Sequence, residues 1–146
     1  MKNAEKDFAQ LKLENQLCFP LYACSKEVVK KYKPYLDAIG LTYTQYITMM
    51  VMWEHKKLNV TQIGEKLYLD SGTLTPLLKT LEKKGLIERR RWIADERVME
   101  IILTEKGAAL KERATSVPEK VRGCLNISSE EAQTLYDLLY KVLKND

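Results

Sequence analysis

The sequence lacks a long hydrophobic run. Its 146 residues are 45% hydrophobic, but the longest uncharged apolar stretch, residues 41–53, is interrupted by threonine and glutamine. A membrane-spanning helix needs about 18 to 20 apolar residues. The N-terminal segment alternates charged with single apolar residues and has no continuous apolar segment of the kind found in secretory signals. We therefore expect a cytoplasmic protein with no membrane association.

Cysteine and histidine are scarce. The three cysteines, Cys18, Cys24 and Cys124, are odd in number and fit neither a disulfide framework nor a zinc-binding spacing. At least one thiol is therefore expected to be free. His55 is the single histidine, and no metal-ligand pattern surrounds it. We expect no metal site, no cofactor and a structural role for His55.

The length predicts one domain, because domains average about 150 residues. Charged residues make up 30% of the chain, and the formal net charge is only +4. That net charge says little about partners, so the distribution of charge along the chain matters more.

Capping patterns predict most of the helices. The first helix has Leu17, Leu21 and Val28 on one face and is expected to end at Pro34, with a turn at Gly40. The predicted caps of the later helices are a capping box from Thr42 to Gln45, Asn59 or Thr61, Asp70 with Ser71, Thr104, and a second capping box from Ser128 to Glu131. The helix that follows Asn59 carries Ile63, Leu67 and Leu69, and the next one ends near Lys84 and Gly85.

Two short strands interrupt the helical pattern. Residues 86–92 and 98–103 alternate in character and are joined by a polar turn over residues 93–96. The helix that follows is expected to be interrupted at Pro118. A pair of short helices followed by a hairpin is typical of a winged helix-turn-helix. The predicted fold is mainly α with a small β-hairpin wing.

The helix that begins near Asp70 has two different faces. Leu74, Leu77, Leu78 and Leu81 form an apolar stripe, and the opposite face carries Gly72, Pro76, Lys79 and Lys83, flanked by Thr75. Small and hydroxyl groups suit base edges in the major groove, and lysines suit phosphates. The alternative is the solvated face of an ordinary amphipathic helix.

Basic residues are concentrated directly after this helix. Residues 79–97 contain seven basic and four acidic side chains. Arg97, at the predicted hairpin tip, could enter a minor groove while Asp95 orients its guanidinium. The alternative is a surface Asp–Arg pair of little energetic value.

Several motifs resemble one known family. Residues 67–91 (LYLDSGTLTPLLKTLEKKGLIERRR), Asp95–Arg97 and LTEKG at 103–107 resemble the MarR family of winged-helix repressors. LENQLCF at 13–19, YKP at 32–34, Thr42 with Tyr43, WEH at 53–55 and YLDSGTLTP at 68–76 are similar to its organic-hydroperoxide-resistance branch. The residues expected to contact DNA are Ser71, Gly72, Thr73, Thr75, Pro76, Lys79, Lys83, Arg89, Arg90, Arg91, Asp95 and Arg97.

The resemblance implies a homodimer on a palindromic, double-stranded DNA operator. It predicts a single domain over residues 1–146, with a DNA-binding part at about 41–104. Dimerisation helices are expected at about 1–40 and 105–146 and should interlock with those of the second copy. It also implies a thiol switch that responds to organic hydroperoxide.

Cys18 is the candidate sensor. Pro20 is tolerated only in a first turn, so the helix should begin around residues 15–17, where unpaired amides favour a negatively charged sulfur. Tyr22 lies one turn later and could donate to a thiolate. A cysteine in an apolar stretch is more often an inert core residue, but the match to LENQLCF favours the sensor.

The resemblance also implies that Tyr32 and Tyr43 donate to the sulfur. Tyr32 lies 14 residues after Cys18, about 21 Å along a straight helix, so the donor would be the partner subunit's Tyr32. The alternative is that Tyr22, Tyr32 and Tyr43 simply pack at an interface. Cys124 resembles the resolving thiol of two-cysteine members, with a buried structural cysteine as the alternative. Pro20 departs from the family pattern and is expected to bend the first helix, and Cys24 is expected to serve packing.

These residues favour a redox-sensing repressor that binds its operator when reduced and is released when Cys18 is oxidised. An alternative is a repressor released by a small aromatic ligand in the dimer crevice. A thiol peroxidase fits poorly, because no basic group accompanies Cys18 at helical spacing. We expect that the protein is not an enzyme.

Overall fold

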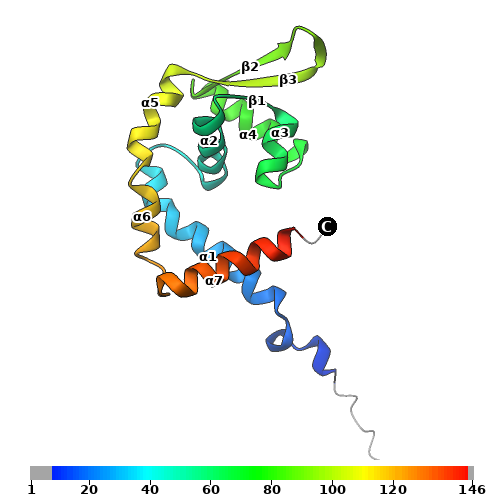
Figure 1. The fold of residues 1–146 in the computed structure, drawn as a ribbon, viewed down its shortest axis with the longest axis vertical. Helices are drawn as coiled ribbons and strands as arrows, with labels where there is room; N and C mark the ends of the chain where they lie inside the picture. The colour runs from blue at the N-terminus through cyan, green and yellow to red at the C-terminus, as the bar shows by residue number, and fades with distance from the viewer. Residues whose placement is uncertain (1–7, 145–146) are drawn as a thin grey trace, which may run out of the picture.

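The computed structural model describes residues 8–144, so the predicted domain ends at 1–7 and 145–146 lie outside the described residues. The chain forms seven α-helices, two short 3-10 helices and three strands over this range (Figure 1). In chain order these are η1 (Ala9–Leu11), η2 (Leu13–Asn15), α1 (Cys18–Asp37), α2 (Tyr43–His55), β1 (Lys57–Asn59), α3 (Val60–Leu67), α4 (Ser71–Lys83), β2 (Ile87–Trp92), β3 (Asp95–Leu103), α5 (Glu105–Ala114), α6 (Val117–Arg122) and α7 (Ser129–Leu143). The predicted winged helix-turn-helix is confirmed.

The predicted helix caps are confirmed, with Asn59 rather than Thr61 at the start of α3. Each cap accepts a hydrogen bond from the backbone N–H three residues later, which satisfies one of the free amides of the first turn. The caps are Thr42, Asn59, Asp70, Thr104 and Ser128. Full capping boxes form at α2, α3 and α7, where a glutamine or glutamate side chain also accepts from the cap's own N–H.

Two predicted helix ends were wrong. α1 continues through Pro34 to Asp37, because a proline near a helix end removes only one N–H from the hydrogen-bond ladder. The chain turns at Gly40, whose φ of +72° suits a residue without a Cβ. α3 ends at Leu67, before Leu69, because Tyr68 adopts the left-handed conformation at its C-cap.

The wing is a three-stranded antiparallel sheet in the order β1-β3-β2. Sequence patterns missed β1, whose three residues are too few to show alternation, and which pairs with the end of β3. The predicted four-residue turn was too long: Trp92 pairs with Asp95, which leaves only Ile93 and Ala94 in the turn.

The buried hydrophobic core lies entirely between Leu36 and Val121. It joins α2, α3, α4 and the sheet to the end of α1 and to α6, and Met49, Met52, Ile63, Leu74 and Leu81 are fully buried within it. In Figure 1 this part lies at one end of the molecule, while α1 and α7 cross at the other end. No helix among the described residues is long and apolar enough to span a membrane.

Candidate nucleic-acid interface and thiol site

The fourth helix presents the predicted face to solvent. Leu74, Leu78 and Leu81 are buried, as the leucine stripe predicted, and they fix the rotation of α4 against the core. The Asp70 carboxylate accepts from the Thr73 N–H at 2.7 Å and caps the helix. The predicted contact residues on this helix are all exposed: Ser71, Gly72, Thr73, Thr75, Pro76, Lys79 and Lys83.

The exposed face of α4 is available for contacts. The Thr75 hydroxyl donates to the Ser71 carbonyl at 2.7 Å, within the first turns of the helix. Within residues 8–144, Lys79 and Lys83 make no ion pair. Free ammonium groups of this kind suit phosphate oxygens.

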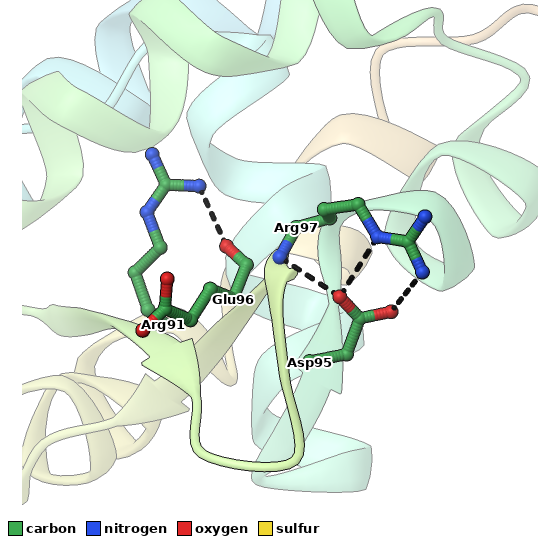
Figure 2. A network of polar contacts seen from close by, with 4 residues as sticks. All are labelled: Arg91, Asp95, Glu96 and Arg97. Atoms are coloured by element: carbon green, nitrogen blue, oxygen red, sulfur yellow. Dashed lines mark hydrogen bonds and ion pairs between the residues drawn. The ribbon is translucent and has the colours of Figure 1, made fainter.

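At the wing, Asp95 holds the guanidinium of Arg97 in place. The Arg97 Nε and Nη2 atoms donate to the two carboxylate oxygens, each at 3.0 Å, and the Arg97 N–H donates to the same carboxylate (Figure 2). The bidentate bond lowers the pKa of the Asp95 carboxyl. The Arg97 side chain is nevertheless 91% exposed. The pairing therefore orients a cation without burying it.

The other three arginines of the hairpin differ in orientation. Arg91 donates to the Glu96 carbonyl at 3.0 Å, and Figure 2 shows its guanidinium lying apart from that of Arg97. Arg90 is exposed and pairs with Glu88 at 2.7 Å. Arg89 is turned toward α4 instead. Its Nε donates to Glu82 at 3.1 Å and its backbone N–H donates to the same carboxylate.

Arg89 therefore joins the fourth helix to the wing. The pair lowers the pKa of the Glu82 carboxyl, and only about a quarter of the Arg89 side chain is exposed. Of the four predicted arginines, Arg90, Arg91 and Arg97 present their cations most openly. Arg89 is better placed to fix the angle between α4 and the hairpin.

Cys18 is the first residue of α1 and is exposed, close to the predicted position. Its amide is one of those without a helical partner. Tyr22 is also exposed, and its ring lies 5.2 Å from the Lys26 ammonium rather than against the sulfur. No hydrogen bond joins Tyr22 to Cys18 within the described part of the chain.

Tyr32 and Tyr43 meet at the opposite end of α1. Their ring centroids are 4.9 Å apart. The Tyr46 ring is tilted against both, with its centroid 5.8 Å from that of Tyr32 and 6.4 Å from that of Tyr43. Burial raises the pKa of Tyr32 and of Tyr43 above the ordinary tyrosine value. Cys18 and Tyr32 lie in the same continuous helix, so Tyr32 is far from Cys18 of its own chain, as predicted.

A groove of about 510 Å³ runs between α1 and α7. Ten residues line it, nearly all apolar: Leu17, Pro20, Leu21, Cys24, Ser25, Val28, Val29, Tyr43, Leu135 and Leu139. Cys24, which was expected to serve packing, is exposed on this groove in the single chain. No residue of α7 is buried, and beyond the groove the helix also exposes Tyr136, Leu138, Tyr140, Val142 and Leu143.

Cys124 follows α6 and is exposed, so the buried structural alternative is wrong for the single chain. Its sulfur lies 3.7 Å from the Tyr35 hydroxyl and donates to the Lys120 carbonyl at 3.3 Å. The contact with the thiol raises the pKa of Tyr35. Tyr35 is 17 residues beyond Cys18, about 25 Å along α1. Cys124 therefore lies far from Cys18 of its own chain.

Comparisons with known proteins agree with this arrangement. The model of the family "Transcriptional regulator SarA/Rot" matches residues 30–114. The organic hydroperoxide resistance transcriptional regulator of Bacillus subtilis is 51% identical over 96% of this chain and 95% of its own length. The regulator SarZ of Staphylococcus epidermidis is 48% identical over 91% and 90%.

The chain belongs to the MarR family of transcriptional regulators. Within it, the similarity confirms the organic-hydroperoxide-resistance branch that the motifs predicted. The family comprises DNA-binding regulators, so this member is not an enzyme, as expected.

Solved structures of AbfR also share the fold and are 36% identical to this MarR-family chain. The reduced and the overoxidised protein, each bound to DNA, superpose with a TM-score of 0.75 and cover 93% of this chain and 96% of theirs. The disulfide form of AbfR covers 93% and 92% and superposes with a TM-score of 0.62.

Sequence patterns missed a contact between the end of α4 and the start of α2 in this MarR-family chain. The Lys84 ammonium donates to the Gly40 carbonyl at 2.6 Å and to the Gln45 side chain at 2.9 Å. Gln45 is also part of the capping box that begins α2, where Tyr43 is the first residue. The end of α4 is thus bonded to the segment that positions Tyr43. No local pattern signals this contact, because its partners are about 40 residues apart in sequence.

Proposed function

We propose that this MarR-family regulator is a repressor whose reduced homodimer binds a palindromic operator and is released when organic hydroperoxide oxidises Cys18. The Cys18 thiolate would attack the peroxide, so that an S–O bond forms, the O–O bond breaks and the alcohol leaves. The sulfur is oxidised to sulfenic acid by two electrons, and the peroxide is reduced. The altered dimer then releases the DNA.

The observation that carries this proposal is the position of Cys18. It is an exposed thiol at the first residue of a helix, in a chain 51% identical to a regulator named for organic hydroperoxide resistance. An accessible sulfur among free helix amides is suited to oxidation, whereas a buried cysteine is inert.

The DNA-binding step is supported by the two exposed elements of the winged helix. α4 would enter the major groove with Ser71 to Pro76 toward base edges and with Lys79 and Lys83 toward phosphates. Arg97, oriented by Asp95, would enter the neighbouring minor groove. The better superposition on DNA-bound AbfR than on its disulfide form supports the described conformation as the DNA-binding one.

The terminal elements would form the dimer. The apolar groove and the exposed apolar face of α7 need a partner surface, and a second copy supplies the same surface. In that dimer the partner subunit's Tyr32 and the partner subunit's Tyr43 would reach Cys18, because those of its own chain lie at the other end of α1.

Cys124 is the candidate resolving thiol across the dimer. Its sulfur is exposed and far from Cys18 of the same chain, so a disulfide would have to form between subunits. A sulfenic acid at Cys18 would condense with the Cys124 thiol and release water, and a small cellular thiol would be the competing reductant.

The groove also supports a second candidate function. A cavity of about 510 Å³ with an almost wholly apolar lining has the size and chemistry for a small aromatic ligand. A ligand bound there would separate α1 from α7 and release DNA without oxidation.

The test compares wild type with Cys18→Ser on an operator duplex. Reduced wild type and Cys18→Ser should bind equally, and cumene hydroperoxide should release only wild type, because a serine hydroxyl cannot form a sulfenate. Cys24→Ser is the matched control and should respond like wild type. Peroxide release of Cys18→Ser would contradict the proposal and favour another thiol, while release by an aromatic compound in both proteins would favour the ligand.

A further inference from the structure

The wing tip carries large apolar side chains that the winged-helix core does not use. Between Leu36 and Val121, only four large hydrophobic residues of the described chain are exposed: Met50, Tyr68, Trp92 and Ile93. Two of these four are neighbours at the end of the hairpin. Ile93 is 100% exposed and Trp92 is 44% exposed.

Folding of the hairpin does not explain Ile93. The turn between β2 and β3 contains only Ile93 and Ala94, since Trp92 pairs with Asp95. Neither residue has a positive φ, so the turn accepts most side chains, and its backbone does not select isoleucine. A fully exposed side chain also gains nothing from burial. The residue therefore serves neither turn formation nor the core.

Arg91 and Arg97 flank this apolar tip, together with the carboxylates of Asp95 and Glu96. Arg97 is the third residue after the turn, and the Arg91 guanidinium lies on the opposite strand, apart from that of Arg97 (Figure 2). Both side chains are exposed, and the tip belongs to the wing that the proposed function places on DNA. A stable protein interface buries about 800 Å² on each side, more than two side chains on one turn offer. DNA is the partner that this combination of charge and small apolar area fits.

We propose that Ile93, supported by Trp92, enters the minor groove as an apolar wedge beside Arg97. Apolar side chains inserted into the minor groove contact sugar edges and partly unstack a base step. Such a contact displaces no counterion, so its contribution to affinity does not depend on salt. It also favours flexible pyrimidine–purine steps where the wing lies. The inference rests on the DNA binding described under the proposed function.

The decisive variant is Ile93→Asn. Ile93 is fully exposed and does not have a positive φ, and asparagine is common in turns, so the substitution should leave the melting temperature unchanged while it removes the apolar contact. Ile93→Leu retains an apolar side chain and is the matched control. Lys79→Ala, a predicted phosphate contact, is the control for salt dependence.

The probe is a duplex selected by the reduced wild-type protein from a random-sequence pool, with affinity measured by fluorescence anisotropy from 50 to 200 mM salt. Ile93→Asn should bind roughly tenfold more weakly at every salt concentration, because two wings per dimer each lose apolar burial. Its plot of log affinity against log salt should keep the wild-type slope. Ile93→Leu should bind like wild type, and Lys79→Ala should reduce the slope.

Three results would overturn the inference. Unchanged affinity of Ile93→Asn would remove the tip from the DNA complex. A changed salt slope for this variant would show that the lost contact was electrostatic. Lost self-association with unchanged DNA affinity would make the tip a protein contact. Failure of the proposed function is distinguishable from these, because wild type would then select no duplex or would ignore peroxide.

Discussion

The middle and the ends of this MarR-family chain differ in how much of their apolar surface is buried. Within residues 8–144, the buried hydrophobic residues all lie between Leu36 and Val121, whereas η1, η2, most of α1 and α7 leave most of theirs exposed. Fifteen large exposed hydrophobic residues lie within residues 8–29 and 127–143. The middle of the chain covers its own apolar side chains, whereas the ends leave theirs uncovered in the single chain.

This difference separates the two tasks of the molecule. The winged helix is held by its own core, so α4 and the wing keep their geometry within a single chain. The sensor end has a thiol at one end of α1 and tyrosines at the other. If the proposed site is assembled from two chains, sensing depends on the dimer. The bonds of Lys84 to Gly40 and Gln45 join the end of α4 to the start of α2, where Tyr43 lies.

The largest effect is expected from disrupting the ends. Leu135 lines the groove on α7 and is half exposed in the single chain. Leu135→Glu should place a charge in the dimer interface, yield monomers, and weaken operator binding by a factor of roughly 100 or more through lost bivalency. Analytical ultracentrifugation and anisotropy measure both, with Leu135→Met as control. If Leu135→Glu remains a dimer, the claim that the ends bury their apolar surface against a second copy is contradicted.

A change in the middle should instead lower stability without changing the assembly. Leu78 is 1% exposed in the core between α4 and its neighbours. Leu78→Ala removes buried methyl groups and leaves a cavity, so the free energy of unfolding should fall by about 2 to 5 kcal/mol. Urea denaturation followed by circular dichroism measures this. A loss below about 1 kcal/mol would mean that the winged helix is not the closed core described.

A smaller effect is expected at the surface of the wing. Arg97→Ala removes an exposed guanidinium with no core contact, so operator binding should weaken by about 1 to 3 kcal/mol while melting temperature and dimer remain unchanged. Arg89→Ala offers a contrast, because it should also lower stability through loss of the bond to Glu82. If Arg97→Ala binds like wild type at moderate salt, the wing makes no contact through this residue.

Local signals predicted most of the fold. The five caps, the leucine stripe of α4 and the Asp95–Arg97 pair all depend on residues within seven positions of each other, and each lies as the spacing indicated. The family motifs, which are likewise local, predicted the regulator branch.

Longer-range features could not be predicted in the same way. β1 forms only because Lys57 to Asn59 meet the end of β3, more than 40 residues later. The contacts of Cys124 with Tyr35 and of Lys84 with Gln45 join residues 89 and 39 positions apart. The inward turn of Arg89 depends on where Glu82 lies after α4 and β2 pack together. Sequence periodicity predicts which residues share one face of a helix or strand, but it does not predict which distant residues pack against that face.

The central claim is that the sensor is assembled from two chains. Heterodimers with one Cys18→Ser subunit test it directly, because they contain a single sensing sulfur. If Tyr32→Phe is placed on the Cys18→Ser chain, the remaining Cys18 faces an altered partner, and its oxidation by cumene hydroperoxide should slow. If Tyr32→Phe is instead placed on the chain that keeps Cys18, the oxidation rate should match that of a heterodimer with both Tyr32 side chains intact. The opposite pattern would show that each chain senses alone and would contradict the account.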